Sequence, residues 1–156
     1  NVFIAGGDAQ GSSSVPDVQR GQGKETKASL IGLHSALFHA KSAWVAVLAC
    51  DLPFASSDLF RRLVTIAGNA GARFDAVVPE QPDGRLQPLA AIYRREPCLK
   101  TVEAMLDANE FRLTEFTSRV PTYVFEPAMY SDIDPEGRLF FNVNTPDDLA
   151  AALRQE

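Results

Sequence analysis

The sequence predicts a three-layer α/β fold, with helices packed on a mostly parallel sheet that contains one antiparallel strand. Two observations carry this prediction. Residues 44–49 form a continuous apolar run, which is typical of a strand covered on both faces. Along the rest of the chain, segments with helical apolar spacing alternate with short apolar runs. The 156 residues suffice for one domain, 1–156, with a core of its own.

The first half of the chain is expected to alternate between strands and helices. Apolar residues recur at helical spacing over 29–40, and the polar stretch before them has almost no apolar anchors. A serine followed by Asp58 favours the start of a second helix. In order, we expect a strand at 2–5, a Gly-, Ser- and Gln-rich loop at 8–28, a helix at 29–40, a strand at 44–49, and a helix from Ser56 or Ser57 to about Gly68.

The second half continues the alternation. A Gln-Pro-Asp-Gly turn at 81–84 separates two apolar runs, so the second run is expected to be antiparallel to its neighbour. Thr145 and Pro146 are typical of an N-cap and the first residue of a final helix. In order, we expect strands at 74–79 and 89–93, helices at 97–108 and 112–117, strands at 123–125 and 140–143, and a helix at 147–155.

Composition narrows the class of function. A formal net charge of −5 without a basic stripe argues against a nucleic-acid partner. No apolar run approaches the about 20 residues that a membrane span needs. The two cysteines, Cys50 and Cys98, lie far apart, which favours a reduced, cytoplasmic setting with structural thiols.

Asp51 is the first candidate for a functional residue. It follows the apolar run at 44–49, and Pro53 biases Leu52 to an extended conformation, so the chain leaves the sheet there. In open α/β sheets, ligands bind at the carboxyl ends of strands. A single carboxylate suffices for Mg²⁺, which takes its other ligands from water and phosphate. The alternative is that Asp51 only caps a turn.

Asn142 and Asn144 supply amide oxygens at a second expected strand end. Together with Asp51, they suggest a divalent cation that holds a nucleotide phosphate. The alternative is that this segment is simply the start of a helix.

Gln87 and Arg112 are candidates for ligand recognition. Gln87 precedes an expected strand, where it could recognise a polar ligand or lie on the surface. Arg112 could bind a phosphate with its fork of donors or be solvated. The glycines between Gly6 and Gly23 match neither the P-loop nor the dinucleotide-binding fingerprint.

Three segments together resemble the molybdenum cofactor guanylyltransferases, the MobA-type enzymes. They are Ala-Cys-Asp-Leu-Pro-Phe at 49–54, Gln-Pro-Leu-Ala-Ala-Ile-Tyr at 87–93, and Phe-Asn-Val-Asn-Thr-Pro-Asp-Asp-Leu at 141–149. The resemblance runs in the family's order over nearly the whole chain. It implies a three-layer αβα, Rossmann-like nucleotidyltransferase fold in a cytoplasmic enzyme.

The resemblance also implies an activity and a set of roles. The family uses Mg²⁺ to transfer GMP from GTP to molybdopterin, forming molybdopterin guanine dinucleotide and pyrophosphate. Asp51 and Asn144 are similar to its catalytic metal ligands, with Asn142 beside them. Other proteins of molybdenum cofactor biosynthesis, or acceptor molybdoenzymes, are implied as partners. The remaining implied roles are nucleotide binding by Asp17, Leu30 and Gly32, and contacts on the pterin side by Gln87 and Arg112.

Two departures from the family's pattern bear on activity. The amino-terminal loop that holds the triphosphate is absent, so we expect that residues precede Asn1 in the complete protein. The family's Gly-Pro-Leu-Ala-Gly loop reads Ala28-Ser29-Leu30-Ile31-Gly32, and alanine replaces a glycine where backbone meets nucleotide. Two alternatives remain: a cytidylyl or related nucleotidyl transferase, and a degenerate domain that binds nucleotide or cofactor without turnover.

Overall fold

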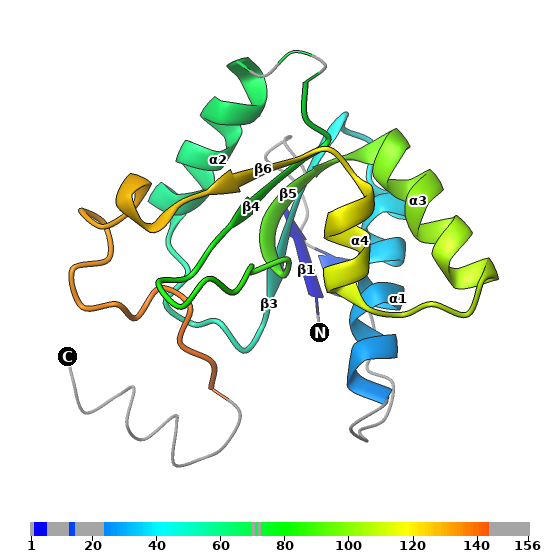
Figure 1. Cartoon of the computed structure of the whole chain (residues 1–156), viewed down its shortest axis with the longest axis horizontal. Coiled ribbons are helices and arrows are strands. Elements are labelled where there is room, and N and C mark those ends of the chain that lie inside the picture. Colours follow the sequence, from blue (N-terminus) through cyan, green and yellow to red (C-terminus); the bar gives the residue numbers. More distant parts are fainter. Residues whose placement is uncertain (1, 6–12, 15–23, 70, 72, 144–156) are drawn as a thin grey trace.

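The computed structural model describes residues 2–5, 13–14, 24–69, 71 and 73–143, and in them a mixed sheet lies between two layers of helix (Figure 1). The strands are β1 (Val2–Ala5), β2 (Ser13–Ser14), β3 (Trp44–Ala49), β4 (Ala76–Pro79), β5 (Ala90–Arg94) and β6 (Thr122–Phe125). The helices are α1 (Lys24–His39), α2 (Ser57–Asn69), α3 (Arg95–Asp107), α4 (Leu113–Arg119) and the 3-10 turn η1 (Pro127–Met129).

The sheet has six strands within the described residues, in the order β2-β1-β3-β5-β4-β6. β3, β4 and β6 run in one direction, and β5 runs against them between β3 and β4. Among these four strands β5 is the one antiparallel strand that the sequence predicted. Since β1 also pairs antiparallel with β3, the sheet has fewer parallel neighbours than expected.

Two hydrophobic clusters fill the spaces on either side of the sheet. Strand side chains alternate between the faces, so Val45 and Val47 of β3 point to one cluster, and Trp44, Ala46 and Leu48 pack against the other. α1, α3 and α4 cover the first cluster. α2 and the chain after β6 cover the second, to which Phe125, Tyr130, Leu139 and Phe140 contribute. The mixed α/β fold with three layers is confirmed.

Several elements differ from the sequence prediction. α1 begins at Lys24, within the segment expected to be a loop, because its first turns consist of Lys, Glu, Thr and Ala, which can form helix without apolar anchors. Ser13–Ser14 of the same expected loop pair with β1. The turn at 81–84 is confirmed, with a hydrogen bond of 2.9 Å from the Gly84 N–H to the Gln81 carbonyl and a positive φ of 82° at Gly84.

The expected strand at 140–143 is wrong. The Asp134 carboxylate accepts the N–H groups of Arg138 and Leu139, at 2.7 and 3.1 Å, and the Phe141 N–H donates to the Arg138 carbonyl at 2.9 Å. These donors therefore close a turn rather than pair with a strand. The expected helix at 147–155 lies outside the described residues. In the described part of the chain, no helix combines the length and apolar character needed to cross a bilayer.

Candidate active site

Two segments that are distant in the sequence meet at the carboxyl end of β3. The Val143 N–H donates to the Asp51 backbone carbonyl at 2.8 Å. Figure 1 shows the end of β3 and the orange chain before the grey trace at the lower edge of the sheet. The structure thus brings Asn142, which is exposed, to the segment that carries Asp51. Asn144 lies outside the described residues.

The Asp51 carboxylate has a buried oxygen, Oδ1, that makes no hydrogen bond. Within the described structure, two other buried side-chain atoms share this property, but each lies near an opposite charge. The Nε of Arg94 is 3.2 Å from Asp75, and the Oε2 of Glu110 is 2.6 Å from Arg119. A buried carboxylate oxygen without a partner is costly, so Asp51 Oδ1 is the atom here that a ligand would most stabilise.

The surroundings of Asp51 fit a magnesium site of the open kind. No group of three or more His, Cys, Asp or Glu side chains that could hold a metal occurs among the described residues. Mg²⁺ does not need such a cage, because one or two carboxylates plus water and phosphate oxygens complete its shell. The unpaired Asp51 oxygen is the kind of ligand that this shell uses. A turn-capping role does not use this oxygen, since it accepts no backbone N–H.

The loop between β4 and β5 lies at the same edge of the sheet and carries Gln87. The Ala49 N–H at the end of β3 donates to the Leu89 carbonyl at 2.8 Å, which joins this loop to β3. The Gln87 N–H donates to the Pro79 carbonyl at 2.8 Å, and the Gln87 side chain is half-buried. The loop is therefore fixed by backbone hydrogen bonds next to the strand that leads to Asp51.

Two buried tyrosines donate hydrogen bonds to backbone carbonyls of this loop. The Tyr93 hydroxyl donates to the Pro88 carbonyl at 2.6 Å, and the Tyr130 hydroxyl donates to the Glu80 carbonyl at 2.7 Å. Burial raises the pKa of Tyr130 to about 12 and raises the pKa of Tyr93 as well. Both hydroxyls therefore keep their protons and remain donors at neutral pH. Neither role was predicted from the sequence; the partner of Tyr130, Glu80, lies 50 residues away along the chain.

An aromatic contact also joins the two segments at the end of β3. The Phe54 ring lies 6.3 Å from the Phe141 ring at 60°, and the Arg138 guanidinium lies 4.1 Å over the Phe54 ring. The roles of Phe54, Asp134 and Arg138 were not predicted from the sequence. The Asp-Pro-Glu-Gly run at 134–137 is a turn signal that could have pointed to Asp134.

Comparison with known proteins gives the family. Residues 2–120 match the family described as MobA-like NTP transferase domain. The chain belongs to this family. The chain is 35% identical to a probable molybdenum cofactor guanylyltransferase of Pelotomaculum thermopropionicum, over 97% of the chain and 71% of that protein. It is 29% identical to the molybdenum cofactor guanylyltransferase of Desulfosudis oleivorans, over 81% of the chain but only 60% of that protein.

A solved structure supports the same assignment. The MobA-like chain resembles the crystal structure of molybdopterin-guanine dinucleotide biosynthesis protein A from Archaeoglobus fulgidus with a TM-score of 0.68 and 28% identity. The match covers 79% of this chain and 60% of that one. The Rossmann-like nucleotidyltransferase fold expected from the sequence is confirmed.

The structure describes three of the other predicted residues, which lie on or next to helices of this MobA-like domain. Leu30 is fully buried in the core on α1, and Gly32 is half-buried within the same helix. Arg112 is exposed directly before α4, with its guanidinium 4.0 Å from the Glu115 carboxylate. Asp17 lies outside the described residues. No contact in the structure tests their predicted roles in binding nucleotide or pterin.

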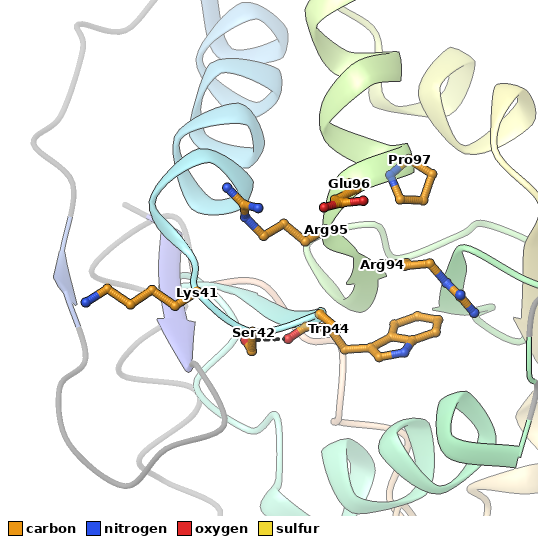
Figure 2. A pocket seen from close by; sticks show the side chains of 8 residues that line it. Lys41, Ser42, Trp44, Arg94, Arg95, Glu96 and Pro97 are labelled. Carbon is orange, nitrogen blue, oxygen red and sulfur yellow. Dashed lines mark hydrogen bonds between the residues drawn. The ribbon is translucent and has the colours of Figure 1, made fainter.

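A pocket of about 420 Å³ lies at the opposite end of β3 in the MobA-like domain (Figure 2). Both arginines that line it make contacts within the protein. Arg94 stacks over Trp44 at 5.1 Å and pairs with Asp75, while Arg95 donates to the Leu37 carbonyl of α1 at 3.0 Å. The lining residues are Lys41, Ser42, Ala43, Trp44, Arg94, Arg95, Glu96 and Pro97. Because Trp44 begins β3 and Asp51 follows its end, this pocket is separate from the candidate active site.

Proposed function

We propose that the chain forms the nucleotidyl-transfer domain of a molybdenum cofactor guanylyltransferase, which transfers GMP from GTP to molybdopterin. In this reaction an oxygen of molybdopterin bonds to the α-phosphorus of GTP as the bond to pyrophosphate breaks. The observation that carries the proposal is the unpaired buried oxygen of Asp51 at the carboxyl end of β3 in a MobA-like domain. The names of the relatives support guanylyl transfer.

In this proposal Asp51 holds Mg²⁺ through its carboxylate, and Asn144, with Asn142 beside it, is the candidate second ligand. When bound, Mg²⁺ neutralises charge on the phosphates and orients them. The hydrogen bond between Val143 and Asp51 keeps the two segments in register. Such positioning is most of what phosphoryl-type transfer requires of a protein, because no covalent step on the protein is needed.

Further roles in the proposal concern the substrates. Gln87 and Arg112 contact the pterin side, and Asp17, Leu30 and Gly32 belong to the nucleotide side. Support for Gln87 is its fixed, half-buried place on the loop joined to β3. Both cysteines are free thiols, which supports a cytoplasmic setting, where proteins of molybdenum cofactor biosynthesis or acceptor molybdoenzymes would be the partners.

The test is Asp51→Asn in the complete protein, with pyrophosphate release from GTP and molybdopterin as the readout. Turnover should fall about 100-fold or more, because a metal ion contributes several kcal/mol to transition-state stabilisation. The matched control is Asp58→Asn on α2, which removes an exposed carboxylate paired with Arg61 and should leave turnover unchanged. Urea unfolding of both variants checks that the fold persists.

The same assay separates the alternatives. Unchanged turnover in Asp51→Asn would contradict the assignment of Asp51 as a magnesium ligand. Pyrophosphate released from CTP in preference to GTP would favour a cytidylyl transferase. Nucleotide binding without any pyrophosphate release by the unmodified protein would favour a domain that binds without turnover.

A further inference from the structure

The chain at 138–143 reaches Asp51 without being part of the sheet. Leu139 and Phe140 are anchored in the core, where Phe140 packs edge-on against Tyr130 at 5.5 Å. Beyond them the backbone is held to the β3 end by the hydrogen bond from Val143 to Asp51. A single strand-like hydrogen bond does not fix a segment, so other contacts must set its path.

Asp134 supplies the first of these contacts. Its Oδ1 accepts two backbone N–H groups, from Arg138 at 2.7 Å and Leu139 at 3.1 Å. The turn between them closes with a 3.1 Å hydrogen bond from the Gly137 N–H to the Asp134 carbonyl, and Gly137 has a positive φ of 67°. This carboxylate therefore sets the direction in which the chain leaves the turn toward Asp51.

Phe54 supplies the second contact. It lies three residues after Asp51, and its ring meets Phe141 edge-on and the Arg138 guanidinium face-on. The ring thus connects the loop that carries Asp51 to both ends of the turn that precedes Val143. Ring–ring and cation–ring contacts are directional, so an aliphatic side chain of similar size would not replace them.

We propose that Asp134 and Phe54 are positioning residues of the metal site, which hold the segment bearing Asn142 against the Asp51 loop. This inference rests on the proposed function for the identity of the metal-bound nucleotide. Positioning residues around a metal ligand contribute to metal affinity although they touch neither metal nor substrate.

The experiment compares four variants of the complete protein with two control variants. Asp134→Ala removes both hydrogen bonds, whereas Asp134→Asn keeps an acceptor oxygen in place. Phe54→Leu removes the ring, whereas Phe54→Tyr keeps it. Glu136→Gln is the control for charge, because Glu136 is an exposed partner of Arg138 in the same turn. Phe74→Leu is the control for the loss of an aromatic ring. Phe74 precedes β4 in the chain, and its ring contacts Tyr123 at the other end of the sheet.

Two readouts do not depend on turnover. The first is the affinity for Mn²⁺ in the presence of GTP, measured by electron paramagnetic resonance. Asp134→Ala and Phe54→Leu should weaken it about 10- to 100-fold, the range typical for such supporting residues. The second is hydrogen exchange of the peptide that contains Val143, which should become about fivefold faster, as expected for one lost hydrogen bond. Asp134→Asn, Phe54→Tyr and both controls should stay near the unmodified protein.

The outcomes separate this inference from the proposed function. Unchanged exchange at Val143 in Asp134→Ala and Phe54→Leu would show that the segment is held by other contacts and would overturn the inference. Faster exchange with unchanged Mn²⁺ affinity would also overturn it, because the segment would then not serve the metal. If the unmodified protein binds Mn²⁺ with GTP but releases no pyrophosphate, guanylyl transfer fails while the positioning test still stands.

Discussion

At the scale of single residues, the aspartates differ in their ion-pair and hydrogen-bond partners, which the sequence alone does not reveal. Asp75 pairs with Arg94, Asp132 pairs with Arg62, and Asp134 accepts two backbone N–H groups. The pKa of Asp132 is lowered, first by its hydrogen bond to Arg62. Asp51 alone among these four has a buried oxygen without a partner. Its charge is therefore not needed by the fold, which is why a ligand is the best account of it.

The two cysteines should differ sharply in reactivity. Cys50 is exposed after β3, whereas Cys98 is fully buried on α3 and donates to the Asp75 carbonyl at 3.2 Å. Burial raises the pKa of Cys98 to about 12, so its thiolate is scarce at neutral pH. We expect iodoacetamide at pH 7.5 to alkylate Cys50 and spare Cys98, as measured by peptide mass spectrometry. In denaturant both should react; equal labelling in the native protein would contradict the burial of Cys98.

At the scale of elements, the loop at 80–89 shows how strands and buried hydroxyls together fix a site. β5 runs antiparallel to both its neighbours, so its entry loop lies at the same edge as the exits of β3 and β4. The Tyr93 hydroxyl, on β5, donates to the Pro88 carbonyl near one end of this loop. The Tyr130 hydroxyl, after η1, donates to the Glu80 carbonyl at the other end. The place of Gln87 therefore depends on a residue that follows β6.

Tyr130→Phe tests this support. The variant keeps the ring but leaves the part-buried Glu80 carbonyl without its donor, so the free energy of unfolding should fall by about 1 kcal/mol. Hydrogen exchange should rise in the 80–89 loop more than in α1. The control is Tyr123→Phe, whose hydroxyl makes only a 3.6 Å contact with the Met129 sulfur and should matter little in urea unfolding. Equal losses in the two variants would argue against a specific role for Tyr130.

At the scale of the whole molecule, local sequence patterns predicted the layers of helix and sheet. Features that depend on contacts between distant residues were predicted less well. The apolar run at 44–49 and the helical spacings of α1, α2 and α3 follow from burial, which acts on each segment separately. The sequence also predicted that the Asp51 and Asn142 segments would meet, from the location of ligand sites in α/β sheets. It could not predict the turn at 138–141, because that turn depends on the Asp134 carboxylate, which accepts the N–H groups of Arg138 and Leu139.

The buried thiol and tyrosines also predict how stability depends on pH. The folded state raises the pKa of Cys98 from 9.0 to about 12 and that of Tyr130 from 10.0 to about 12, mainly through burial. Below about pH 9 these groups are protonated in both states, so their contribution to stability is fully present. Between about pH 9 and 12 the unfolded groups ionise first, which favours unfolding, and stability is lost by up to about 1.4 kcal/mol per pH unit for each group.

The measurement is urea unfolding at a series of pH values from 7 to 11. The free energy of unfolding should be level near neutral pH and fall with increasing slope above about pH 9. Cys98→Ser keeps a donor for the Asp75 carbonyl but removes the titrating thiol, so its curve should fall less steeply between pH 9 and 10. The control, Cys50→Ser, changes the exposed thiol and should keep the steeper slope. If both variants fell in parallel with the unmodified protein, the alkaline instability would have to come from groups other than Cys98.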